Sequence, residues 1–268
     1  MAILAGAEAL AAVYTAVEVV DYTSGTGVSA SLTNPSAALG LPNPIVPGSF
    51  GYPDTSLNPF TPHWNGSNIV QVGFGGQLTL RLERFVTVTP GLMELGVWEN
   101  VFLLQASGPA GTAKNPAVVA GADSAAVEVS ADGTNFVSVG IKTFGWFGNY
   151  WTDSPGPSSS GGTQMADFGM PFVGALSDFN GLGYANVLAQ LEGNAGGTWL
   201  DLDSSGLSQV GWVRFSGVAS GSTLELDGLA INTSLAGAST IPEPSTILLL
   251  GVSACLLIFY ARKRLHDH

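Results

Sequence analysis

The side chains most often used in catalysis are few in this sequence. Its three histidines are His63, His266 and His268, and the last two belong to the C-terminal tail. The single cysteine, Cys255, lies in an apolar run before that tail, which excludes a disulfide or a cysteine nucleophile elsewhere in the chain. The sequence contains no Gly-x-Ser-x-Gly elbow, phosphate-binding loop or His-Glu-x-x-His helix. We therefore predict that the protein is not an enzyme and expect His63 to be a solvated loop residue.

Aromatic residues gather in one short segment. Residues 144–151 read FGWFGNYW, with five aromatic residues in eight positions. Because aromatic faces stack on sugar rings, the segment is a candidate platform for carbohydrate. The candidate binding residues are Trp146, Phe147, Tyr150 and Trp151. The alternative is that these rings cap or close the core of the domain.

Three aspartates are candidate ligands for a structural Ca²⁺ ion, and no other cofactor is expected. They are Asp201, Asp203 and Asp227. Carboxylates in loops suit Ca²⁺, which takes six to eight oxygen ligands. However, Asp201-Leu202-Asp203 lacks the ligand spacing of an EF-hand, and aspartate also favours turns without a metal. A carboxylate pair for glycoside hydrolysis stays open, because such acids are paired in space rather than in sequence.

The charge of the chain argues against a nucleic acid partner. The net charge is −12, and three of the eight basic residues lie in the tail. Residues 1–242 contain five basic and eighteen acidic residues, a net charge of −13. Such a surface repels phosphates, which are bound by lysine and arginine.

The elements that must position these residues are predicted to be strands. Leu78, Leu80 and Leu82 alternate with polar residues, which indicates one buried and one exposed face. Segments 126–130 and 136–140 flank an Asp-Gly turn and predict a hairpin. Strands are also expected at 210–215 and 224–231, and a short helix at 185–191. Seven prolines between residues 24 and 62 predict a long surface loop there.

Together these patterns predict an all-β fold. We expect a single β-sandwich or jelly-roll-like ectodomain over residues 17–231, since many short strands alternate with glycine-rich turns. Residues 232–240 are small and are expected to form a linker. Residues 1–16 are mostly apolar, but they lack lysine and arginine and contain Glu8. They predict a degenerate signal peptide or a truncated start; a short helix with no targeting role is the alternative.

The last thirty residues carry the most specific pattern. Pro242, Glu243 and Pro244 precede an uncharged apolar run. Residues 245–261 make 17 positions, at the short edge of the roughly 17–25 that span a bilayer as a helix. The basic cluster that follows predicts a cytoplasmic C-terminal end. It consists of Arg262, Lys263 and Arg264.

This order resembles the PEP-CTERM sorting signal of Gram-negative bacteria that make extracellular polysaccharide, over residues 241–264. The resemblance implies that an exosortase-type membrane transpeptidase recognises the Pro-Glu-Pro motif. The protein would be exported, anchored in the inner membrane before processing, and then located at the cell surface or in the extracellular matrix. Its β-sandwich would be displayed outside without catalytic activity. A plain tail-anchored domain is one alternative. A carbohydrate-binding module of the envelope or exopolysaccharide is another.

Overall fold

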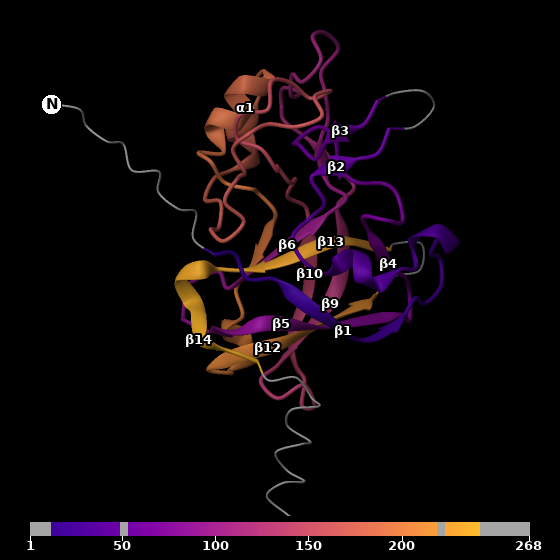
Figure 1. Cartoon of the computed structure of the whole chain (residues 1–268), viewed down its shortest axis with the longest axis vertical. Helices are drawn as coiled ribbons and strands as arrows, with labels where there is room; N and C mark the ends of the chain where they lie inside the picture. Colours follow the sequence, from indigo (N-terminus) through magenta and orange to yellow (C-terminus); the bar gives the residue numbers. More distant parts are fainter. Residues whose placement is uncertain (1–11, 49–52, 219–222, 242–268) are drawn as a thin grey trace, which may run out of the picture.

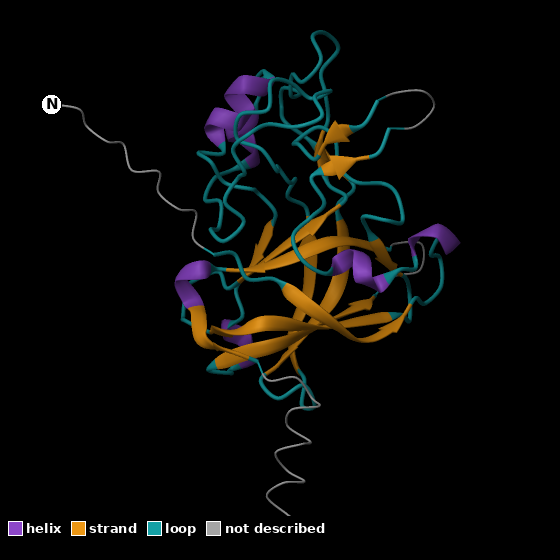
Figure 2. Ribbon diagram, in the orientation of Figure 1, coloured by secondary structure: helices purple, strands orange, loops and turns teal. Residues whose placement is uncertain are grey.

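The computed structural model of the chain describes residues 12–48, 53–218 and 223–241. The described residues are mainly β-strands, with one α-helix and short 3₁₀ turns (Figures 1 and 2). In this part of the chain no helix is long and apolar enough to cross a membrane. The expected membrane span at 245–261 and the segment 1–11 lie outside the described residues. The all-β prediction is confirmed.

The elements have the following bounds. The strands are β1 (Ala16–Thr23), β2 (Ile45–Val46), β3 (Thr55–Ser56), β4 (Val70–Val72), β5 (Gln77–Thr87), β6 (Leu95–Glu99), β7 (Phe102–Leu103), β8 (Val119–Ala120), β9 (Asp123–Ser130), β10 (Val137–Phe144), β11 (Thr198–Leu200), β12 (Gln209–Gly217), β13 (Leu224–Ile231) and β14 (Ala236–Thr240). The helix is α1 (Tyr184–Gln190), and the 3₁₀ turns are Ala30–Leu32, Pro35–Ala38, Leu176–Phe179, Asp203–Ser205 and Thr233–Leu235.

Two antiparallel sheets enclose the main core. The larger sheet has the order β1-β5-β12-β9-β10, and β14 also pairs with β5. The smaller sheet has the order β11-β6-β13-β4. One hydrophobic cluster contains Leu80 and Val213 from the larger sheet and Val97 and Leu226 from the smaller one. The two sheets therefore form facing layers, as Figure 2 shows.

Strand β5 lies between β1 and β12 in the larger sheet. Leu78, Leu80 and Leu82 are fully buried, as their alternation predicts. The opposite face was expected to be exposed, and that expectation is wrong for Thr79 and Arg81, which are 1% and 6% exposed. The physical reason is tertiary, because other parts of the chain cover these two side chains.

The predicted Asp-Gly hairpin is confirmed as β9 and β10, paired in antiparallel register. Asp132 organises its turn, since its Oδ1 accepts the backbone N–H groups of Thr134 and Asn135, each at 2.8 Å. Gly133 has a φ of 75°, a conformation that glycine adopts without strain.

A loop-rich region covers the smaller sheet and occupies the upper part of Figure 1. It has its own apolar cluster, in which Leu103, Phe147, Phe179 and Leu191 are buried. Helix α1 packs here, which confirms the short helix expected near residues 185–191. The proline-rich segment 24–62 contains only 3₁₀ turns and the two-residue strands β2 and β3 among its described residues.

The segment 232–240 does not form the expected linker. It forms a 3₁₀ turn, Thr233–Leu235, and then strand β14, which pairs antiparallel with β5. The small residues of this segment suggested flexibility, but their backbone instead pairs with β5. The described fold therefore continues to Ile241.

Candidate functional site

The residues directly before Pro242 are fixed to the larger sheet. In β14, Ala236 lies opposite Val86 and Thr240 lies opposite Arg84. The Ile241 backbone N–H donates to the Glu83 carbonyl oxygen at 3.2 Å. The Ile241 side chain is 3% exposed and belongs to the main core. We call residues 236–241 the C-terminal latch.

Two arginines of β5 bind the backbone of this C-terminal latch. Arg81 donates through Nη1 to the Ile241 carbonyl oxygen at 3.1 Å, and through Nε to the Glu18 carboxylate. Arg84 donates through Nη1 to the Gly237 carbonyl oxygen at 3.2 Å. Both backbone polar groups of Ile241 are thus engaged. No local pattern in the sequence indicated this arrangement, since the arginines and the segment that they bind are about 150 residues apart.

The predicted sorting residues follow immediately in the sequence. Pro242, Glu243 and Pro244 lie outside the described residues, as does the basic cluster at 262–264. The structure thus places Ile241, the residue directly before Pro242.

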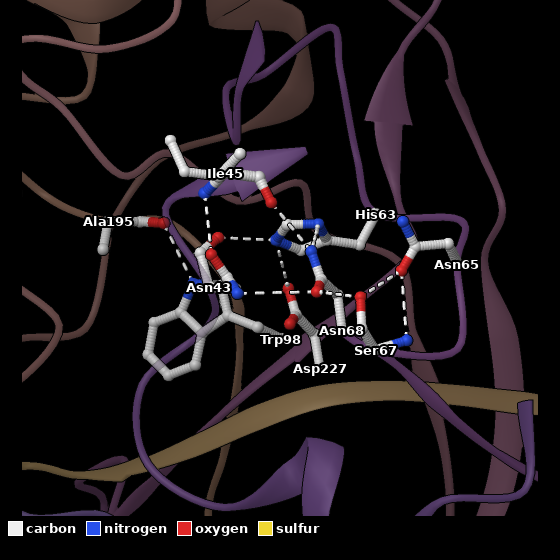
Figure 3. A network of polar contacts seen from close by, with 9 residues as sticks. All are labelled: Asn43, Ile45, His63, Asn65, Ser67, Asn68, Trp98, Ala195 and Asp227. Carbon is white, nitrogen blue, oxygen red and sulfur yellow. Dashed lines mark hydrogen bonds and ion pairs between the residues drawn. The ribbon is translucent and has the colours of Figure 1, made fainter. Parts of the chain in front are cut away.

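A second polar group is buried around His63 (Figure 3). Asn68 donates through Nδ2 to His63 Nδ1 at 2.8 Å and to the Ile45 carbonyl oxygen at 2.8 Å. Because an amide nitrogen can only donate, Nδ1 of the imidazole must accept, and the proton lies on Nε2. The Nε2–H then donates to the Asn43 carbonyl oxygen at 2.6 Å. This network is that of a neutral imidazole.

Asp227, from β13, is the acidic neighbour of this imidazole. Its Oδ2 lies 3.6 Å from His63 Nε2, and its Oδ1 has no hydrogen-bond partner among the described residues. Burial raises the pKa of Asp227 well above its usual value, and burial lowers the pKa of His63 to about 4. Both groups therefore favour their neutral forms, since removal from water penalises charge.

The fold encloses this pair. The side chains of His63 and Asp227 are only 1% and 2% exposed, so neither contacts a molecule outside the fold. The expectation of a solvated His63 is wrong, because the loop that carries it packs over β13. The network ties segment 43–68 to the smaller sheet, beside Trp98, whose indole N–H donates to the Ala195 carbonyl oxygen (Figure 3).

The four candidate sugar-binding rings do not form one exposed platform. Phe147 is fully buried. Trp146 is partly buried and stacks on Phe147 and on Phe172, each with ring centroids 5.4 Å apart. Tyr150 packs elsewhere, against Phe168, at 5.3 Å, and Trp151 contacts Tyr150 at 4.9 Å. The alternative, in which these rings close the core, describes them better, because they pack against other aromatic rings of the protein.

A shallow apolar depression lies next to Trp146. Its volume is about 310 Å³ and its lining includes Trp146, Trp199, Phe172 and Met93. Trp199 comes from β11 and was not selected from the sequence, because it lies about fifty residues from the aromatic segment. The rings that line this depression therefore differ from the four rings that are close together in the sequence.

The three candidate calcium ligands do not converge. Asp201 Oδ1 accepts the Asp203 backbone N–H at 2.8 Å, and Asp203 Oδ2 accepts the Gly91 backbone N–H at 2.8 Å. Asp227 instead lies beside His63. Among the described residues, no group of three or more His, Cys, Asp or Glu side chains could hold a metal ion. Asp201 and Asp203 thus act as turn-forming residues, which was the alternative interpretation.

A buried carboxyl group on the smaller sheet was missed by the sequence reasoning. Glu99, in β6, is 4% exposed, and its Oε2 has no hydrogen-bond partner in the described part of the chain. Burial, with a further contribution from the nearby Asp123 charge, raises the pKa of Glu99 well above its usual value. Glu225 lies beside it and accepts hydrogen bonds from Gln71 and Asn100. The sequence around Glu99 is mostly apolar, so it did not indicate a buried carboxyl group at this position.

The comparisons with known proteins agree with the C-terminal pattern. The chain carries a PEP-CTERM protein-sorting motif at residues 240–264. No curated protein matches the chain, and no solved structure matches it. The family evidence therefore concerns the signal, and it implies export and exosortase-mediated sorting.

Proposed function

From the PEP-CTERM motif at residues 240–264, we propose that this chain is a cell-surface or extracellular-matrix protein processed near Pro242, Glu243 and Pro244. The apolar segment 245–261 anchors it in the inner membrane before processing. Arg262, Lys263 and Arg264 hold the tail on the cytoplasmic side. After processing, a non-catalytic β-sandwich is displayed outside, in contact with extracellular polysaccharide.

One observation carries this proposal. The sorting motif begins at residue 240, and the described fold extends to Ile241. The described strands therefore all precede Pro242, so processing near the Pro-Glu-Pro motif removes the tail without removing any of them. A signal placed within the core would not permit this.

The non-catalytic role is supported by the burial and the hydrogen bonding of the titratable side chains. His63, the one histidine before the tail, is buried and hydrogen-bonded on both ring nitrogens. The carboxyl groups of Glu99 and Asp227 are buried on the neighbouring strands β6 and β13, and both have raised pKa values. These features favour a role in the fold rather than in a reaction.

Carbohydrate binding is a second candidate, favoured by the depression lined by Trp146, Trp199 and Phe172. Apolar depressions with aromatic walls suit sugar rings. The test is affinity electrophoresis through gels that contain the host polysaccharide. Retardation that Trp199→Ala removes and Trp64→Ala preserves supports binding there. Equal migration of the wild-type protein with and without polysaccharide rejects it.

The sorting proposal is tested by following the C-terminus. The full chain is expressed in a polysaccharide-forming host with exosortase and in the same host without it, and products are analysed by fractionation and intact mass. We expect loss of the tail near Pro244 only where exosortase is present. Glu243→Ala should reduce processing, whereas Glu192→Ala, at an exposed position of the domain, should not. An intact tail in both hosts rejects the proposal.

A further inference from the structure

The C-terminal latch directly precedes Pro242 in the chain. Its last residue, Ile241, is buried, and both of its backbone polar groups are hydrogen-bonded. We propose that the C-terminal latch controls processing: residues 236–241 must detach from β5 before the sorting enzyme can engage the motif. This inference rests on the proposed function, since it concerns access to the same signal.

The first step of the argument is spacing. The matched motif starts at residue 240, which lies in β14, and the next residue, Ile241, is hydrogen-bonded to β5. Pro242 has no backbone N–H and cannot extend the pairing with β5. The motif is thus joined to the domain without a flexible spacer.

The second step concerns the backbone. Enzymes and domains that bind extended peptides use the main-chain N–H and C=O groups of the peptide. The Ile241 N–H is held by Glu83 and its carbonyl oxygen by Arg81. A sorting enzyme that binds residues on both sides of the motif competes for these same groups. Release of Ile241 frees them.

The third step is that β14 is paired with β5 at few positions. Its register with β5 is fixed at Ala236 and Thr240, with an irregularity between them. By contrast, β12 pairs with β9 without a shift over six residues, from Trp212 to Gly217. When the C-terminal latch leaves, Arg81 keeps its Glu18 partner, so the guanidinium is not left as an unpaired buried charge.

The structure offers a substitution that loosens the C-terminal latch without changing the motif. An added Cβ at Gly211, in β12, would lie 2.7 Å from the Ile241 terminal methyl group and 2.8 Å from the Phe85 ring. Gly211→Ala therefore pushes directly on the buried Ile241. Gly228→Ala is the matched control, because its Cβ would crowd Pro42 at 3.0 Å on the other sheet.

A second variant locks the C-terminal latch in place. Val86 and Ala236 face each other in the pairing of β5 with β14. The double substitution Val86→Cys and Ala236→Cys places two thiols at opposite positions of adjacent strands, where a disulfide can form. All chains carry Cys255→Ser, so that no other thiol competes. Reduction then releases the lock in the same protein.

The experiment measures the rate of tail loss by pulse-chase and intact mass in the host with exosortase. Over-packing by a methyl group shifts such an equilibrium by about fivefold or more, so Gly211→Ala should raise the rate by that factor. Gly228→Ala should leave the rate near that of the wild-type chain. The oxidised double-cysteine variant should keep its tail until dithiothreitol is added to membranes that contain the enzyme.

The outcomes separate the two proposals. If the wild-type chain is not processed, the sorting function fails and the latch inference falls with it. If the wild-type chain is processed and the locked and loosened variants react at its rate, only the latch inference is overturned. The same holds if the locked variant reacts faster or if Gly228→Ala accelerates processing as much as Gly211→Ala.

Discussion

Acidification should destabilise the fold through His63. Its folded-state pKa is lowered to about 4 from an ordinary value of 6.5, chiefly by burial. Between these two pH values the unfolded chain binds a proton that the folded chain excludes. Stability contributed by neutral His63 is therefore fully present above pH 6.5 and is lost as the pH falls towards 4.

The magnitude follows from the two pKa values. Proton linkage gives a loss of about 2 kcal/mol at pH 5 and about 3 kcal/mol at pH 4, relative to pH 7. Asp227 faces His63 and acts in the opposite direction, because its pKa is raised by burial. Its neutral form is favoured at low pH, so its contribution to stability declines as the pH rises above its unfolded-state pKa.

The assay must isolate the imidazole from these other groups. Urea unfolding followed by tryptophan fluorescence is measured from pH 7 to pH 4 for the wild-type protein and for His63→Gln. Glutamine does not titrate, yet its amide can donate to the Asn43 carbonyl oxygen or accept from Asn68. The difference between the two curves should grow by about 3 kcal/mol at pH 4. Asp227→Asn in both backgrounds removes the opposing carboxyl group.

Two results would contradict a buried, neutral His63. Parallel curves for the wild-type protein and His63→Gln would mean that His63 is protonated as easily in the folded as in the unfolded state. A wild-type protein that gains stability over the variant on acidification would mean that His63 carries a charge paired with ionised Asp227. That ion pair raises the folded-state pKa of the imidazole and reverses the sign.

Three further predictions concern particular positions. Ile241→Ala should lower the free energy of unfolding by roughly 2–5 kcal/mol, because the side chain is 3% exposed; a urea midpoint unchanged from wild type would restore the linker interpretation. Trp98→Phe should lower the free energy of unfolding by about 2 kcal/mol, measured by calorimetry, because it removes ring volume and one buried hydrogen bond. The control Trp64→Phe, at a position 52% exposed, should lower it by almost nothing. Equal losses of stability in the two variants would contradict this prediction. Asp132→Ala should speed amide hydrogen exchange at Asn135, since it removes the carboxylate that accepts this N–H, and unaltered exchange would show that the turn does not need it.

Local features of the sequence were sufficient for several elements. The alternation of Leu78, Leu80 and Leu82 predicted the buried face of β5, because side-chain direction in a strand depends only on its period of two. The Asp-Gly pair predicted the β9–β10 hairpin, since turn geometry is set by a few adjacent residues. The sorting signal is also linear, which is why its position was confirmed.

Features that depend on which segments meet could not be obtained in this way. His63 and Asp227 lie 164 positions apart in the chain, and only the packing of a loop over β13 brings them to 3.6 Å. Trp146 joins Phe172, while Tyr150 joins Phe168, although the sequence groups Trp146 with Tyr150. Hydrophobic burial is non-directional, so composition alone does not decide which rings become neighbours.

Consecutive residues alone were enough to predict that the chain is rich in strands and ends in a sorting signal, because strand alternation and the signal are both local patterns. By contrast, only the folded chain showed that residues 236–240 form a strand rather than a linker. Their small side chains carry little information, and the partners that hold them, Arg81, Glu83 and Arg84, are supplied by β5. An extended backbone becomes ordered when a distant strand satisfies its hydrogen bonds, and only the fold provides that strand.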